Sequence, residues 1–256
     1  MSTNTIIAAS VPEHRIAGVL LSEHTRLDLL AEGKSGPRLF KIKSAENAFV
    51  RSRANSLLKH RYAWRGYQSV CLPTDQTINR ITLSALEGDA TIGTITVALD
   101  GPEKLAADDI FGTELAELRA EGRRLCEFTK LAVDPIAGSK RVLAALFHVS
   151  YVVAHRMRDR DTIVIEVNPR HVRYYERVLG FRVLGEQRLN RRVNAPAVLL
   201  VADFSYIMEQ IGEFGGRPEL SATERSLYPL FFSLSEEAGI LKRMMQAQTP
   251  PSTRLN

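Results

Sequence analysis

The spacing of apolar side chains predicts strands and helices along the first half of the chain. Apolar residues within 50–58 recur at the spacing of one face of a helix. Residues 78–88 and 90–100 have the pattern of two strands, and the stretch from Glu87 to Asp89 between them has the composition of a hairpin turn. The other elements expected here are a short strand at 38–44 and a helix near 106–121.

The second half continues with further strands and helices. Residues 125–133 form a mostly apolar strand that Asp134 and Pro135 end, and Ser139 is placed to cap a long helix. The segment 162–167 is apolar on both faces, which is typical of a central strand. Two more strands are expected at 181–189 and 195–204.

A short, clearly marked helix follows the central strand. Asn168 is a favourable N-cap residue, and Pro169 occupies a position where a helix tolerates a missing N–H. Gly180 is placed for a left-handed C-cap. The helix carries adjacent tyrosines, Tyr174 and Tyr175, and the pattern alone predicts only that these side chains pack.

From Ser205 onward the pattern becomes helical. Ser221 with Glu224, and Ser233 with Glu236, have the spacing of capping boxes, and Pro229 interrupts between them. We therefore expect an N-terminal extension at 1–37, one folded α/β domain at 38–204, a helical extension at 205–248 and a disordered tail at 249–256.

Composition narrows the classes of protein without choosing one. The 256 residues are 45% hydrophobic and 25% charged, as in ordinary globular proteins, and the net charge is +5. Residues 139–192 hold twelve Lys or Arg against five Asp or Glu, which suits an acidic partner or is simply a solvated basic face. No nucleic-acid module is recognisable, so we expect no nucleic-acid partner.

The sequence shows no sign of secretion, of a membrane span or of metal binding. The N-terminal stretch has no basic region typical of a signal peptide, and the longest apolar run, 142–154, is too short to span a membrane. We expect Cys71 and Cys126 to be reduced thiols in the cytoplasm. The His and Cys residues do not have metal-ligand spacing, so we expect no metal site.

Glu127 is the strongest candidate for chemistry, because it is a carboxylate within an apolar strand. Burial would raise its pKa toward that of a general base, although a buried Glu paired with an arginine is the alternative. Strand alternation places Glu127 with Thr129, Leu131 and Val133 on one side, and places Phe128 and Lys130 on the other. Cys126 also lies on that other side, with no histidine placed near it, so we do not expect a nucleophile there.

Three segments resemble known enzymes. The stretches CEFTKLAVDP (126–135) and NPRHVRYYERVLGF (168–181) are similar to acyl-homoserine-lactone synthases and, more closely, to long-chain N-acyl amino acid synthases of the FeeM type. The segment HRYAWRGYQ (60–68) is loosely similar to their basic, aromatic N-terminal part. The resemblance covers roughly residues 38–204. It implies the GNAT acyltransferase fold: a mostly antiparallel central sheet with splayed middle strands and helices on both faces.

The resemblance also implies roles for residues. Glu127 would assist the attacking amine, and Tyr174 or Tyr175 would protonate the departing thiolate. The residues implied to bind the acceptor are Lys130, Arg65 and Asn168. The residues implied to bind the acyl-pantetheine donor are Leu131, Val133, Gly138, Ser139, Lys140 and Arg141.

The loop before the long helix bears on the donor. Ordinary acetyltransferases of this fold have several small residues there, which cradle the pyrophosphate of coenzyme A. Here VDPIAGSKRVL (133–143) has Gly138, but Lys140 occupies the second small position. The helix start still suits one phosphate. We therefore expect a phosphopantetheine thioester on acyl carrier protein as donor substrate, with no bound cofactor.

The resulting hypothesis is an N-acyltransferase that joins a long-chain acyl group to the α-amino group of an amino acid by direct attack. The alternatives are an acyl-homoserine-lactone synthase, an acyl-CoA-dependent N-acetyltransferase, and a non-catalytic GNAT-like module that binds acyl groups or a partner. Peripheral membrane contact would arise through acyl products. The identity of the amino acid, the acyl chain length and the oligomeric state stay open.

Overall fold

The computed structural model describes most of the chain. The described residues are 5–11, 38–46, 48–63, 70–72, 79–137 and 139–248. At residues 5–11, 38, 247 and 248 the backbone alone is described. The predicted tail at 249–256 and most of the predicted extension at 1–37 lie outside these ranges.

A mixed sheet forms the centre of the fold. Its strands follow the order β1-β2-β3-β4-β5-β6-β9-β7, and β8 pairs with β9. Neighbouring strands are antiparallel except β5 and β6, which are parallel. The strands are β1 (Thr5–Val11), β2 (Arg38–Ser44), β3 (Arg80–Glu87), β4 (Ala90–Leu99), β5 (Leu125–Val133), β6 (Thr162–Val167), β7 (Arg182–Val183), β8 (Arg188–Asn190) and β9 (Ala195–Asp203).

The two middle strands diverge. The β5–β6 ladder has three residue pairs, from Leu125 opposite Thr162 to Glu127 opposite Val164. Beyond these pairs β5 continues to Val133 and β6 to Val167 without pairing to each other. The predicted mostly antiparallel sheet with splayed middle strands is therefore confirmed, and the divergence opens space for a ligand within the sheet.

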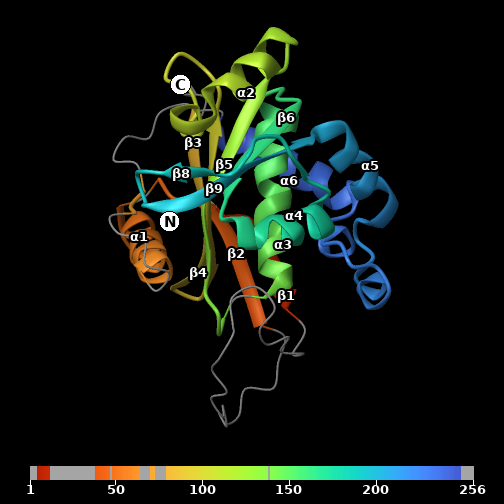
Figure 1. The fold of residues 1–256 in the computed structure, drawn as a ribbon. Helices are drawn as coiled ribbons and strands as arrows, with labels where there is room; N and C mark the ends of the chain where they lie inside the picture. Colours follow the sequence, from red (N-terminus) through yellow and green to blue (C-terminus); the bar gives the residue numbers. More distant parts are fainter. Residues whose placement is uncertain are drawn as a thin grey trace, which may run out of the picture.

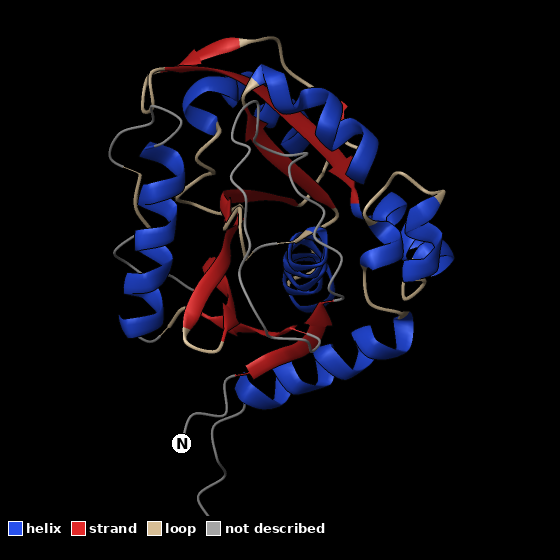
Figure 2. Ribbon diagram, turned by 90° about the horizontal axis from the view of Figure 1, so that it is seen from below, coloured by secondary structure: helices blue, strands red, loops and turns tan. Residues whose placement is uncertain are grey.

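Helices cover both faces of the sheet, as predicted (Figures 1 and 2). One face packs against α3 and the C-terminal helices in the main core, and the other packs against α2 and α1 in two smaller clusters. The α-helices are α1 (Ala48–Ala63), α2 (Asp108–Ala120), α3 (Lys140–Tyr151), α4 (Val172–Leu179), α5 (Phe204–Phe214) and α6 (Leu234–Gln248). The other helical turns are η1 (Val152–Met157, a π-helix), η2 (Pro169–His171), η3 (Pro218–Ala222) and η4 (Tyr228–Leu230).

The caps predicted for the two central helices are present. Ser139 is extended, and its Oγ accepts a hydrogen bond from the Val142 N–H at the start of α3. The Asn168 side chain accepts from the Arg170 N–H, which starts η2 and leads into α4. Gly180 ends α4 with φ of 72°, where a Cβ would collide with the Tyr206 ring. A glycine is needed there both for its backbone conformation and for the close contact.

Two sequence predictions need correction. The strand predicted at 181–189 is divided into β7 and β8. Between them the chain leaves the ladder at Gly185, where a Cβ would lie 2.9 Å from the Phe111 ring. Ser221 does not cap a helix but lies inside η3. The Ser233 capping box is confirmed, because Ser233 and Glu236 exchange side-chain to backbone hydrogen bonds.

The C-terminal segment after β9 packs into the main core rather than standing apart from it. Ile207, Tyr228 and Phe231 are buried members of the core cluster around α3. The Tyr228 hydroxyl donates to the Leu179 carbonyl (2.7 Å), which anchors the segment to the end of α4. No helix within the described ranges is long and apolar enough to cross a membrane.

Candidate active site

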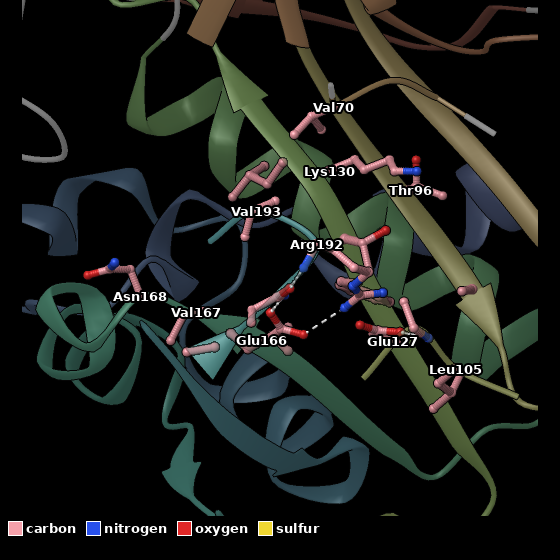
Figure 3. A pocket seen from close by; sticks show the side chains of 18 of the residues that line it. Val70, Thr96, Leu105, Glu127, Lys130, Glu166, Val167, Asn168, Arg192 and Val193 are labelled. Carbon is pink, nitrogen blue, oxygen red and sulfur yellow. Dashed lines mark hydrogen bonds and ion pairs between the residues drawn. The ribbon is translucent and has the colours of Figure 1, made fainter. Parts of the chain in front are cut away.

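A cavity of about 640 Å³ opens where β5 and β6 diverge. Its wall combines apolar side chains with several charged ones that converge on one region (Figure 3). The charged residues in the wall are Arg80, Glu103, Asp109, Glu127, Lys130, Glu166 and Arg192. Mixed apolar and convergent polar lining is typical of small-molecule sites, so this cavity is the candidate active site.

Glu127 lines the cavity and is 1% exposed. Its Oε2 accepts hydrogen bonds from the N–H groups of Ala106 (2.7 Å) and Ala107 (3.4 Å), just before α2. Burial is the main cause that raises the pKa of this carboxyl to about 7, and nearby Glu166 raises it further, whereas the two amides and Arg192 lower it. The carboxyl is therefore fixed in place and able to exchange a proton near neutral pH.

A second carboxylate, Glu166 on β6, faces the same cavity and was missed by the sequence reasoning. Its Oε1 accepts from the Asn190 side chain, and its Oε2 accepts from Arg192 (3.0 Å). Arg192 also pairs with Asp109 (3.4 Å). Figure 3 shows Glu127, Glu166 and Arg192 beside one another in the cavity wall. Burial is the main cause that raises the pKa of Glu166.

A β-bulge at Lys130 corrects the predicted faces of β5. The β4–β5 register shifts between Thr94 and Thr96, and Lys130 has φ of 52°. The extra residue reverses the alternation after Thr129. Leu131 therefore packs toward the main core with Phe128, as Val133 does, instead of sharing the side of Glu127.

The same bulge brings Lys130 to the cavity wall. The prediction that Lys130 faces away from Glu127 is wrong, because it assumed a regular strand. Lys130 is half-buried, and this burial is the main cause that lowers the pKa of its ammonium group. Arg80 and Arg192 also lower it, whereas Cys71 and Glu127 act to raise it. A partly desolvated cation inside a cavity is suited to bind an anionic group.

The two tyrosines of α4 have different environments. Tyr175 lines the cavity and contacts the rings of Phe147 and Phe181 at centroid distances of 6.3 and 6.2 Å. Tyr174 does not line the cavity, and its buried hydroxyl makes no hydrogen bond with any described residue. Burial raises the pKa of the Tyr174 phenol. The structure thus separates the pair as helix geometry requires, since adjacent residues point about 100° apart.

The other predicted site residues are divided between the cavity and its surroundings. Asn168 and Leu131 line the cavity. Arg65 and Gly138 lie outside the described residues. The predicted donor-binding residues that do not line the cavity are Val133, Ser139, Lys140 and Arg141.

Two backbone N–H groups of the loop between β5 and α3 donate hydrogen bonds within the loop itself. The Asp134 side chain accepts hydrogen bonds from the N–H groups of Ile136 (2.8 Å) and Ala137 (2.7 Å), so these two are not available to a ligand. The first-turn amides of Lys140 and Arg141 have no acceptor within their own helix. The N–H groups of Lys140 and Arg141 at the start of α3 are therefore the backbone donors that could bind a ligand there.

The remaining thiols and histidines do not form a nucleophilic pair. Cys126 and Cys71 are both free thiols, and complete burial raises the pKa of Cys126. His148 is instead fully buried between Glu237 (3.1 Å) and the Phe232 N–H (3.0 Å). The described residues contain no cluster of His, Cys, Asp and Glu that could hold a metal ion.

Comparison with known proteins agrees with this geometry. The family model "N-acyl amino acid synthase FeeM" matches residues 53–203, more than half of the chain. A solved structure of FeeM from uncultured soil microbes matches with a TM-score of 0.57 and 25% identity, covering 65% of this chain and 90% of that chain. The AHL synthase LasI matches with a TM-score of 0.46 and 14% identity, covering 64% and 88%. No curated protein sequence matches.

The splayed sheet with its flanking helices is a GNAT acyltransferase fold. Within that class, the chain belongs to the FeeM family of N-acyl amino acid synthases. It is therefore an acyltransferase. The family match ends at residue 203, so α5 and α6 lie beyond it.

Proposed function

We propose that this chain transfers a long-chain acyl group from a thioester to the α-amino group of an amino acid. The observation that carries the proposal is Glu127, a buried carboxyl with a pKa of about 7 in the wall of a cavity between diverging strands. An attacking amine must lose protons as the amide forms, and a carboxylate that titrates near neutral pH is matched to that task.

The proposed reaction is a direct displacement. The amine nitrogen attacks the thioester carbonyl carbon, and the C–S bond breaks as the tetrahedral intermediate collapses. Glu127 takes a proton from the amine, and the thiolate gains one from a phenol. Tyr175 is the better candidate for that phenol, because it lines the cavity and Tyr174 does not. Fully buried Cys126, with its raised pKa, is unsuited to form an acyl-enzyme.

We infer that the acceptor lies at the charged end of the cavity. Lys130 is suited to bind its carboxylate, because this half-buried cation makes no ion pair within the described part of the chain. Glu166 and Arg192 hold each other beside Glu127 and would orient the amine. Asn168 lines the neighbouring wall, and Arg65 stays a prediction from the resemblance.

We further propose that the donor is an acyl group on acyl carrier protein in the cytoplasm. The start of α3 suits the single phosphate of a phosphopantetheine arm, with Ser139, Lys140 and Arg141 around it. Exposed cations continue on and beside α4, and no described ion pair neutralises them: Arg173, Arg177 and Arg182. An acidic carrier would be attracted to this surface.

The reaction can be tested with purified protein, a long-chain acyl carrier protein and a mixture of amino acids. We expect free thiol to appear together with an equal amount of N-acyl amino acid, identified by mass spectrometry. Release of thiol with free fatty acid alone would contradict amide formation. In a parallel reaction whose amino acid acceptor carries a sulfonium leaving group on its γ-carbon, a lactone product would assign the chain to the homoserine-lactone reaction instead.

A further inference from the structure

Amide formation removes two protons from the acceptor nitrogen, and Glu127 accounts for one of them. An α-amino group is mostly an ammonium ion near neutral pH, so it must lose a first proton before its lone pair can attack. The nitrogen loses a second proton as the amide forms. Because Glu127 is 1% exposed, it cannot pass a first proton directly to bulk water before it takes the second. A further proton acceptor is therefore needed in the cavity.

Glu166 projects from β6 toward the same side of the sheet as Glu127 does from β5. The last residue pair before the two strands diverge is Glu127 opposite Val164, and Glu166 follows two residues later on the same face of β6. This face is the α2 side, because Val164 and Leu199, the partner of Glu166 on β9, both belong to the cluster packed against α2. The two carboxylates therefore lie together in the cavity wall where the strands separate (Figure 3).

Neighbouring groups hold Glu166 in place and leave it able to bind a substrate proton. Its Oε1 accepts a hydrogen bond from the Asn190 side chain, and its Oε2 accepts one from Arg192 (3.0 Å). Each oxygen of a carboxylate has two lone pairs, so each can accept one more hydrogen bond. On Glu127 two backbone amides donate to Oε2, and Oε1 accepts no hydrogen bond from any described residue. An ammonium group between the two carboxylates can therefore donate to both.

Glu166 is closer to solvent than Glu127. Its side chain is 14% exposed, and that of Arg192 beside it is 42% exposed. Asp109 of α2, which pairs with Arg192 (3.4 Å), is more exposed still. A proton on Glu166 can thus pass to water while Glu127 stays covered and free to take the second proton.

The charges around Glu166 suit a group that gains and loses a proton. Burial is the main cause that raises its pKa, and Asp109 acts in the same direction, whereas Asn190 and Arg192 lower it. Glu166 in turn raises the pKa of Glu127. Neighbouring carboxyls of this kind titrate as a pair, and a cation bound between them relieves the repulsion between their negative charges.

We propose that Glu166 binds the ammonium group of the acceptor and takes its first proton, and that Glu127 then takes the second. This inference rests on the acyl transfer proposed above and adds a second proton acceptor to it. The free amine attacks the thioester carbon, the nitrogen gives its second proton to Glu127, and the C–S bond breaks. The thiolate gains a proton from the phenol, the phenol regains one from water, and the two carboxyls release theirs. Each turnover thus converts one ammonium ion and one thioester into one amide, one thiol and one proton in solvent.

The test is the pH dependence of kcat/KM for the amino acid in Glu166→Gln, measured with saturating donor. In the unmodified protein kcat/KM should rise through about pH 7 and then level off, because the ammonium form is itself a substrate. Glu166→Gln can use only acceptor molecules whose amine is already free. Its kcat/KM should therefore keep rising, about tenfold per pH unit, up to the pKa of the amine. A role of Glu166 in packing alone would lower the whole profile without changing its shape.

Glu114→Gln is the matched control. The Glu114 side chain is as exposed as that of Glu166 and also pairs with an arginine, Arg188, but it does not line the cavity. Its profile should level off as in the unmodified protein. Arg192→Gln tests the same claim if Glu166→Gln does not fold. It removes a cation that lowers the pKa of both carboxyls, so the rise should move to higher pH and still level off.

Two results would overturn this inference alone, because amide would still form. One is a profile of folded Glu166→Gln that levels off at the same pH as that of the unmodified protein. The other is an unmoved rise in Arg192→Gln. Failure of the unmodified protein to form amide from any donor would remove the proposed function, and this inference with it.

Discussion

At the scale of single residues, Glu127 shows what the sequence can predict. A lone carboxylate in an apolar strand indicates burial, and the structure confirms both the burial and a raised pKa. Glu166 is likewise a lone carboxylate in an apolar strand, and it was missed because residues 162–167 were interpreted as apolar on both faces. Its partners Asn190, at the end of β8, and Arg192, in the following turn, lie more than twenty residues later, and only the folded sheet brings them to the cavity wall.

Glu127→Gln is expected to lower turnover by ~10²–10⁴, because the amide cannot accept the proton. Activity of the unmodified protein should rise with pH through about 7, since the deprotonated carboxyl is the active form and its pKa is about 7. The variant should lose this rise. The measurement is kcat/KM against pH, with melting temperature to verify folding. Full activity in the folded variant would rule out Glu127 as the base.

Tyr175→Phe is expected to slow acyl transfer by roughly tenfold to a hundredfold, because it removes a proton donor from the cavity wall. Tyr174→Phe is the matched control, since it changes the same atom on the adjacent residue and should leave kcat almost unchanged. Single-turnover thiol release from the acyl donor measures both. If Tyr174→Phe is the slower variant, the roles are reversed, and if both are silent, the thiolate leaves without a phenol.

At the scale of elements, regular patterns were predictable and local irregularities were not. The caps at Ser139, Asn168 and Ser233 follow from side chains that compete for nearby backbone groups, so sequence reports them directly. The bulge at Lys130 leaves no comparable pattern, because a lysine with positive φ is held there by the register between β4 and β5. That one irregularity decides which β5 side chains reach the cavity.

The start of α3 carries the prediction about the donor. Lys140→Glu is expected to raise KM for acyl carrier protein by about tenfold, because it reverses a charge where the carrier's phosphate and acidic surface would bind. KM for the amino acid should not change. Lys242→Glu, an equally exposed charge reversal on α6, is the control. Steady-state kinetics at low and high salt measure the effect, which salt should weaken.

The absence of a rise in KM for the carrier in Lys140→Glu would contradict this prediction. If Lys140→Glu raised KM for the carrier no more than Lys242→Glu does, the carrier would bind elsewhere. Better use of the same acyl group on coenzyme A than on the carrier would contradict the donor proposal and favour an acyl-CoA-dependent enzyme.

At the scale of the whole molecule, the C-terminal segment is part of the core rather than an addition to it. The sequence predicted its helical character but not its packing, because contacts between residues far apart in the chain leave no periodic trace. The buried residue His148 makes one of these long-range contacts. In the structure it joins α3 to α6 through Glu237, which also pairs with Arg156 (2.9 Å).

Glu237→Ala should therefore lower the free energy of unfolding by about 3 kcal/mol, because it leaves His148 and Arg156 without their buried partner. Glu209→Ala, at an exposed position of α5, should change it by less than about 0.5 kcal/mol. Denaturant unfolding followed by circular dichroism measures both. Equal stability of the two variants would mean that the ion pairs of Glu237 do not help to hold the C-terminal segment.

The central claim is that this fold makes N-acyl amino acids with Glu127 as the assisting base. The most direct measurement is mass spectrometry of lipid extracts from cells that overproduce either the unmodified protein or Glu127→Gln at matched levels. We predict new N-acyl amino acids with the unmodified protein and at most a trace with the variant. Equal amounts of these products in both extracts, or none in either, would contradict the account.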